Sequence, residues 1–142
     1  MTTIAYKDGI IAYDSRATRG DLIATDSREK CREKNGVIFI LSGRQDHIES
    51  MMALWFGEEI EIKPNSHGFV IADGVLWEIG YDEDFVKLVF DPADHHAFGS
   101  GDYHAITAMD MGASAVEAVQ MAMKRDVYTG GEIRTIKGGG YE

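Results

Sequence analysis

The segment TTIAYKDGIIAYDSR, residues 2–16, decides the fold expected for this chain. It consists of two short runs of β-favouring residues on either side of the pair Asp8-Gly9. An Asp-Gly pair between two such runs is the strongest short-range signal for a β-hairpin, because these residues accept the positive φ values that the turn requires. The sequence therefore predicts a hairpin at 2–16, with Thr2 at the start of its first strand.

Several other segments have the character of β-strands. The continuous apolar run at 37–41 is typical of a strand that is covered on both faces. A second Asp-Gly pair, Asp73-Gly74, separates the apolar runs 69–72 and 75–79 and predicts another hairpin. Further strands are expected at 22–24, 85–90 and 132–136, whereas the polar segment 14–21 is interpreted as a loop.

Helical spacing of apolar residues occurs in three stretches: 44–57, about 102–111, and a segment that begins at Ser114. Ser114 and Glu117 match the capping box, in which each side chain hydrogen-bonds the backbone N–H of the other residue. The predicted helices come in separate blocks and do not alternate with the strands. We therefore expect an α+β fold, with antiparallel sheets and with helices on their outer faces.

The composition excludes several classes of protein. The chain has 142 residues and a formal net charge of −10, which argues against a nucleic-acid partner, because such binding requires a basic face. The single cysteine, Cys31, excludes a disulfide framework and fits a reducing cytosol. No apolar run approaches the roughly 18 residues of a membrane span, and we expect no secretory signal. The expected location is therefore the cytoplasm, without a membrane partner.

The charge is unevenly distributed along the chain. Residues 1–45 contain eight Lys and Arg against six Asp and Glu, whereas the remaining residues contain six against 18. One interpretation is chance placement on a solvated surface. The other is that the first third of the chain builds a site that needs cations inside an acidic shell.

Thr2 follows the initiator methionine and has the chemistry of a nucleophile. A small residue at this position allows methionine aminopeptidase to remove Met1, which would leave Thr2 with a hydroxyl and a free α-amine. The amine can then accept the proton of the hydroxyl. Because an α-amine titrates at about 7.7–8.0, a large fraction is neutral at cellular pH.

Five landmarks recur in an order that resembles proteasome β-type subunits. The resemblance is strongest to the threonine-peptidase subunits of the bacterial two-component ATP-dependent protease, which are N-terminal nucleophile hydrolases. The hairpin 2–16 begins with a threonine and contains Asp14, and Lys30 follows sixteen residues after Asp14. The other landmarks are Ser42-Gly43 after the apolar strand, Gly99-Ser100-Gly101 before a helix, and RDVYTGG at 125–131. The resemblance covers nearly the whole chain.

The resemblance implies a role for each matched residue. Thr2 would be the nucleophile, and Lys30 as an ammonium would favour its alkoxide and disfavour protonation of its α-amine. Asp14 would hold Lys30 in its charged form. The N–H of Gly43 would donate to the oxyanion, which is typically worth a factor of about 10²–10³ in rate. A second group of residues would orient the α-amine of Thr2: Ser100, Asp126 and Thr129.

The same resemblance implies a four-layer αββα sandwich of two antiparallel sheets with the helices outside. One helical layer is expected to be reduced, because 58–67 is too short and Pro-interrupted for a second helix after 44–57. We expect a single domain at 1–137 and a flexible tail at 138–142. The implied partners are a peptide or protein substrate, other copies of the chain and an ATPase unfoldase. No cofactor or metal is expected.

Two alternatives to a threonine peptidase stay open. One is a non-catalytic relative that uses the same fold for assembly or binding, and the other is a hydrolase of small-molecule amides. Residues 91–96 contain four side chains of the kinds that bind metals: Asp91, Asp94, His95 and His96. Because adjacent histidines on a strand point to opposite faces, we interpret that segment as a polar loop.

Overall fold

The computed structural model describes residues 2–138. The first half of the chain forms β1 (Thr3–Lys7), β2 (Ile10–Tyr13), β3 (Ala17–Arg19), β4 (Leu22–Thr25), β5 (Cys31–Lys34), β6 (Val37–Ser42), α1 (Gln45–Trp55) and β7 (His67–Ala72). The second half forms β8 (Val75–Asp82), β9 (Asp84–Val89), β10 (His96–Gly99), α2 (Asp102–Asp110), α3 (Ala115–Arg125) and β11 (Arg134–Lys137).

Within residues 2–138, the strands form two larger sheets and one separate hairpin. The four-stranded sheet has the order β10-β1-β2-β11, the five-stranded sheet has the order β5-β6-β7-β8-β9, and β3 pairs with β4. All of these pairs are antiparallel. The hairpins predicted at Asp8-Gly9 and Asp73-Gly74 are confirmed, and the four turn residues have φ values between 51° and 82°. The expected mixed fold, with antiparallel sheets and helices, is therefore confirmed.

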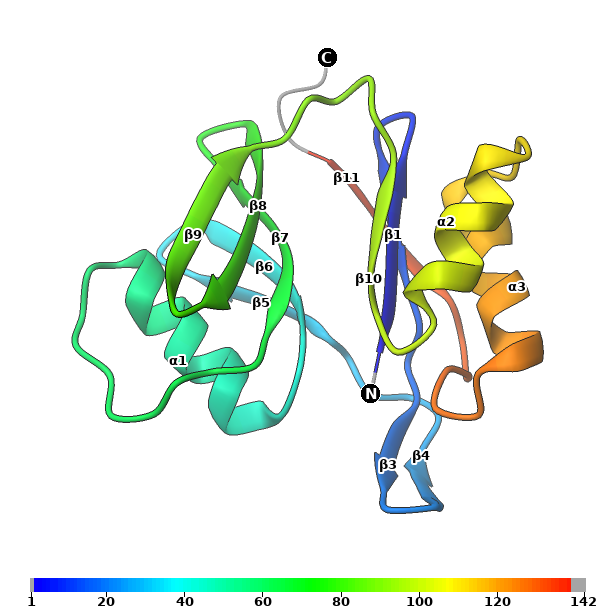
Figure 1. Cartoon of the computed structure of the whole chain (residues 1–142), viewed down its shortest axis with the longest axis horizontal. Coiled ribbons are helices and arrows are strands. Elements are labelled where there is room, and N and C mark those ends of the chain that lie inside the picture. The colour runs from blue at the N-terminus through cyan, green and yellow to red at the C-terminus, as the bar shows by residue number, and fades with distance from the viewer. Residues whose placement is uncertain (1, 139–142) are drawn as a thin grey trace.

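The two larger sheets face each other, and the helices lie on their outer sides (Figure 1). An apolar cluster between the sheets joins β1 and β2 to β6, β7 and β8. Within it, the rings of Tyr6 and Phe69 have centroids 5.9 Å apart, and Phe90 packs edge-on against both. Aromatic side chains dominate core energetics because each buries a large apolar area. This cluster therefore sets the spacing of the two sheets.

Separate apolar clusters attach the helices to the sheets. On the outer side of the four-stranded sheet, Ala105 of α2 and Ala118 of α3 pack with Ala5 and Ala12. Small side chains on both surfaces allow the helices to approach the strands closely. On the five-stranded sheet, the fully buried Met51 attaches α1.

The predicted helices are confirmed with small changes in their bounds. Helix α1 is shorter at each end than the expected 44–57, and residues 58–66 form no helix. At the start of α3 the capping box is present: Glu117 N–H donates to Ser114 Oγ at 3.1 Å, and Ser114 N–H donates to Glu117 Oε1 at 2.9 Å. This cap fixes the first turn of the helix because it satisfies two backbone donors that have no partner within the helix.

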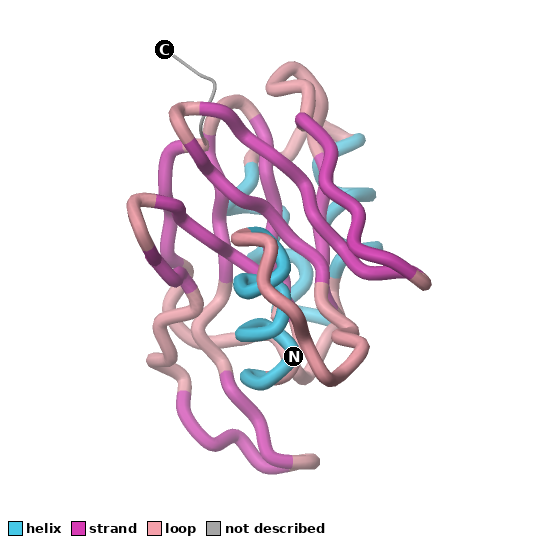
Figure 2. The backbone as a smooth tube through the Cα atoms, turned by 90° about the vertical axis from the view of Figure 1, so that its left-hand side faces the viewer, coloured by secondary structure: helices cyan, strands magenta, loops and turns pink. Residues whose placement is uncertain are grey.

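Three strands differ from the expectations drawn from the sequence. Residues 17–19 form β3 where the sequence predicts a loop, and residues 31–34 and 96–99 form β5 beside β6 and β10 beside β1. All three are too short for an alternating pattern to show in the sequence. The β3–β4 hairpin extends away from the two larger sheets (Figures 1 and 2). Of the expected tail at 138–142, Gly138 N–H donates to Gly9 O at 2.8 Å, and 139–142 lie outside the described residues.

A matched pair of leucines tests the core between the sheets. Leu76 belongs to that core and is 1% exposed, whereas Leu88 on β9 is 55% exposed. We expect Leu76→Ala to lower the free energy of unfolding by about 2–5 kcal/mol, because it removes buried methyl groups and leaves a cavity. Leu88→Ala should change it by less than about 0.5 kcal/mol. Urea denaturation measures both, and equal losses would contradict this packing.

Candidate active site

A buried ion pair joins the end of β2 to the chain that leads into β5. Lys30 Nζ donates to Asp14 Oδ1 at 2.7 Å, with the side chain of Lys30 9% exposed and that of Asp14 fully buried. Three backbone groups also donate to Asp14: Thr3 N–H to Oδ1 at 3.1 Å, and Gly130 N–H and Arg16 N–H to Oδ2 at 3.0 and 3.4 Å. A buried carboxylate is stable only when paired and hydrogen-bonded, so these contacts determine where Lys30 lies.

Burial alters the acidity of Lys30. Removal from water lowers the pKa of its ammonium, while the charge of Asp14 and the hydrogen bond to it act in the opposite direction. Burial prevails, so the pKa of Lys30 lies below the ordinary value of a lysine. The group is thus a fixed cation that gives up a proton more readily than a solvated lysine.

Thr2 directly precedes β1 and is held in place through its own backbone. The residue is 5% exposed, and its carbonyl accepts a hydrogen bond from Ser100 N–H at 2.8 Å. Gly99, at the end of β10, has a φ of +104°, and a Cβ at this position would overlap the carbonyl of Thr2. Glycine is therefore required at Gly99, both by its backbone conformation and by the close approach of Thr2.

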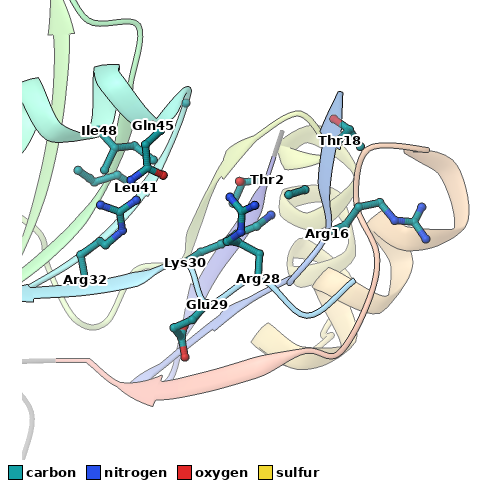
Figure 3. A pocket seen from close by; sticks show the side chains of 12 residues that line it. Thr2, Arg16, Thr18, Arg28, Glu29, Lys30, Arg32, Leu41, Gln45 and Ile48 are labelled. Carbon is teal, nitrogen blue, oxygen red and sulfur yellow. The ribbon is translucent and has the colours of Figure 1, made fainter. Parts of the chain in front are cut away.

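Thr2 and Lys30 line the same cavity, which has a volume of about 170 Å³ (Figure 3). Gly43 also lines this cavity. Gly43 and Thr2 line a second cavity as well, together with Ser100. Gly43 has a φ of +131°, and a Cβ there would lie 2.7 Å from the carbonyl oxygen of Asn65. The predicted nucleophile, cation and backbone donor thus meet at one place.

The three remaining predicted site residues form a second cluster. Ser100 Oγ and Thr129 Oγ1 both donate to Asp126 Oδ2, at 2.5 and 2.6 Å. Because Thr129 donates to the carboxylate, its oxygen accepts the hydrogen bond from Thr3 Oγ1 at 2.7 Å. The cluster therefore connects the ends of β10 and α3 to β1, directly beside Thr2.

The hydrogen bonds also affect the pKa of Asp126. Burial raises this pKa, but hydrogen bonds from Ser100, Thr129 and the N–H of Tyr128 outweigh burial. The pKa of Asp126 consequently lies below its ordinary value, and the carboxylate stays charged at neutral pH.

Three arginines that the sequence did not mark as site residues also line the Thr2 cavity: Arg16, Arg28 and Arg32. Arg28 and Arg32 lie on either side of Lys30 in the sequence. The sequence signal is the presence of three cations within the five residues 28–32. The excess of cations in the first third of the chain agrees with this placement.

In the segment with metal-binding residue types, His95 Nε2 and Asp110 Oδ1 form a hydrogen bond of 2.7 Å, while His96 begins β10. Across residues 2–138, no three His, Cys, Asp or Glu side chains are placed to hold a metal ion together. None of the helices in that range has both the length and the apolar character needed to cross a membrane.

The fold matches solved structures, although the sequence matches neither a family model nor a curated protein. BPH from Thiobacillus denitrificans, solved in complex with epoxomicin, is 16% identical and has a TM-score of 0.67, with 97% of each chain covered. HslV from Trypanosoma brucei is also 16% identical and has a TM-score of 0.68, with 96% of this chain and 99% of that chain covered. The chain therefore has the fold of these proteins, in agreement with the resemblance inferred from the sequence.

Replacement of Ser100 tests the second cluster. We expect Ser100→Ala to raise the pKa of Asp126 toward its ordinary value, because the carboxylate loses a hydrogen bond that favours its charged form. NMR titration of the Asp126 carboxyl group measures the change. Ser114→Ala, which removes a hydroxyl from the cap of α3, is the control and should leave this pKa unchanged. An Asp126 pKa that is the same in wild type and Ser100→Ala would contradict the assigned contact.

Proposed function

We propose that this chain is an N-terminal threonine peptidase of the proteasome type. The observation that carries the proposal is that Thr2, the ion-paired Lys30 and the backbone of Gly43 line one cavity. Removal of Met1 would give Thr2 the free α-amine that the reaction needs. The HslV and BPH structures support the proposal through the fold that they share with this chain.

The reaction follows from the chemistry of these groups. The Thr2 hydroxyl transfers its proton to the α-amine, and its oxygen attacks the carbonyl carbon of a peptide bond. The N–H of Gly43 donates to the oxyanion that forms. When the C–N bond breaks, the departing amine takes the proton and an ester to Thr2 remains. Water then hydrolyses the ester, which releases the acid and restores the hydroxyl.

The surrounding residues prepare Thr2 for this reaction. The positive charge of Lys30 favours the alkoxide of Thr2 and disfavours protonation of the α-amine, while Asp14 holds Lys30 in position. In the proposal, the cluster of Ser100, Asp126 and Thr129 orients the α-amine. Its contacts with the backbone of Thr2 and the side chain of Thr3 support this role.

The proposal extends to architecture and partners. We infer a single domain at 1–137 built as a four-layer αββα sandwich, in which the layer that contains α1 is reduced. The arrangement of sheets and helices in Figure 1 supports it. We further propose a cytoplasmic protein that associates with copies of itself and cleaves peptides or proteins, with an ATPase unfoldase as a candidate partner.

A non-catalytic role in assembly is the second candidate function. It is favoured by the outer surface of α2 and its C-terminal turn, where Tyr103 is 80% and Met111 86% exposed. Exposed apolar patches of this kind mark interaction surfaces. A hydrolase of small-molecule amides is distinguished from a peptidase by whether casein and fluorogenic peptides are cleaved.

Covalent labelling tests the proposed nucleophile. We expect the mature wild-type protein to lack Met1 by intact mass and to gain the mass of one epoxomicin molecule, the electrophile named in the BPH structure. Thr2→Ala should gain no mass, because it lacks the attacking hydroxyl. Absence of labelling in a sample that has lost Met1 would contradict the proposal and favour the assembly role.

Substitution of Lys30 tests the proposed cation. We expect Lys30→Ala to lower kcat by roughly 100-fold or more, since positioned groups that assist proton transfer contribute about 10²–10⁴-fold. Lys34→Ala, which removes an exposed lysine at the end of β5, should retain normal activity. Because Lys30→Ala leaves Asp14 buried without its cation, the double variant Asp14→Asn/Lys30→Ala provides a folded comparison. Normal turnover in either folded Lys30 variant would exclude the assigned role.

A further inference from the structure

Three cations occupy alternate positions beside Thr2: Arg28, Lys30 and Arg32. Arg32 lies in β5, Arg28 and Lys30 lie in the segment just before it, and all three side chains line the cavity of about 170 Å³. In Figure 3, Arg28 extends toward Thr2, and Arg32 points toward the opposite wall of the cavity, where β6 and α1 lie. The cavity is therefore positively charged within a chain whose net charge is −10.

The anionic groups near this cavity are already engaged. Asp14 pairs with Lys30, and Asp26 pairs with Arg16 at 2.8 Å. Glu29 also borders the cavity, but its Oε2 accepts hydrogen bonds from Tyr13 Oη at 2.7 Å and from the N–H of Cys31 at 3.0 Å. Figure 3 shows the carboxylate of Glu29 directed away from Thr2.

Arg28 and Arg32 differ from the other cations of the cavity. Within the part of the chain that the structure describes, neither guanidinium takes part in a hydrogen bond or an ion pair. An arginine presents several N–H donors in a planar fork that matches the two oxygens of a carboxylate. The cavity thus offers two sets of unused donors beside the proposed nucleophile.

We propose that this cavity binds an acidic side chain of the substrate, Asp or Glu, at the residue adjacent to the amide bond that Thr2 attacks. The inference rests on the proposed peptidase function and specifies its substrate class. Arg28 and Arg32 bind the carboxylate, while the apolar side chains of Leu41 and Ile48, which also line the cavity, contact the methylene groups.

Other side chains fit this cavity less well. A lysine or arginine of the substrate would be repelled by the cations that line it. A large apolar side chain would remove water from the guanidinium groups without giving them a hydrogen-bond acceptor, which costs free energy. Glutamine has nearly the shape of glutamate but lacks the charge, and it therefore isolates the electrostatic contribution.

Matched peptides test the inference. They differ only in one residue beside the cleaved bond (Glu, Gln, Leu or Lys) and are amidated at the C-terminus, so that no terminal carboxylate competes. We expect kcat/KM for the Glu peptide to exceed that for the Gln peptide by roughly tenfold, the size typical of a hydrogen bond to a charged group. The assay is run at about 0.15 M salt, where charges beyond about 8 Å are screened.

Variants identify the residues responsible. We expect Arg28→Gln and Arg32→Gln each to reduce the Glu-to-Gln ratio of kcat/KM, and Arg32→Glu to shift preference toward the Lys peptide. Lys34→Gln is the matched control, because Lys34 lies two residues beyond Arg32 and does not line the cavity. It should leave the ratio unchanged. A ratio that is unaffected by both arginine variants would overturn the inference.

The outcomes separate this inference from the function on which it rests. If the wild type cleaves none of the peptides and is not labelled by epoxomicin, the peptidase proposal fails. If it is labelled and cleaves the Leu, Lys or Gln peptide as well as the Glu peptide, the peptidase proposal stands and the acidic preference is wrong. Dependence on a free C-terminal carboxylate in non-amidated peptides, with no dependence on the side chain, would also overturn the inference.

Discussion

The buried ion pair between Asp14 and Lys30 is the interaction on which the position of Thr2 depends. Removal of two charges from water costs several kcal/mol for each ion, so a buried pair persists only where further hydrogen bonds compensate. Here the compensation comes from the backbone of Thr3, Arg16 and Gly130. The same contacts that stabilise the carboxylate therefore fix the start of β1 and the loop before β11, and with them the position of Thr2.

The two-sheet architecture explains why the site lies where it does. Thr2 directly precedes β1 and lies next to Gly99 at the end of the neighbouring strand β10. Gly43 follows β6 in the opposite sheet, so the cavity forms where the ends of the two sheets meet. The aromatic packing of Tyr6, Phe69 and Phe90 holds that spacing. The close backbone contact between Gly99 and Thr2 leaves little freedom for Thr2 to move.

The charge is positive at the cavity and negative over the rest of the chain. Cations gather around Thr2, while residues beyond position 45 carry a large excess of carboxylates. The cations around Thr2 make the cavity a favoured position for an anionic group. The arrangement also has a structural use, since Arg16 pairs with Asp26 and holds the base of the β3–β4 hairpin.

The sequence by itself determined the hairpins at Asp8-Gly9 and Asp73-Gly74 and the helix cap at Ser114, because turn chemistry and capping act over a few residues. It also identified Asp14 and Lys30 through their spacing in a family-like order, while their catalytic roles stay predictions. Only the tertiary structure brought Gly130 to Asp14 across 116 residues and aligned the arginines with Thr2. Such contacts depend on the direction of each side chain after the sheets have packed, and no local pattern encodes that direction.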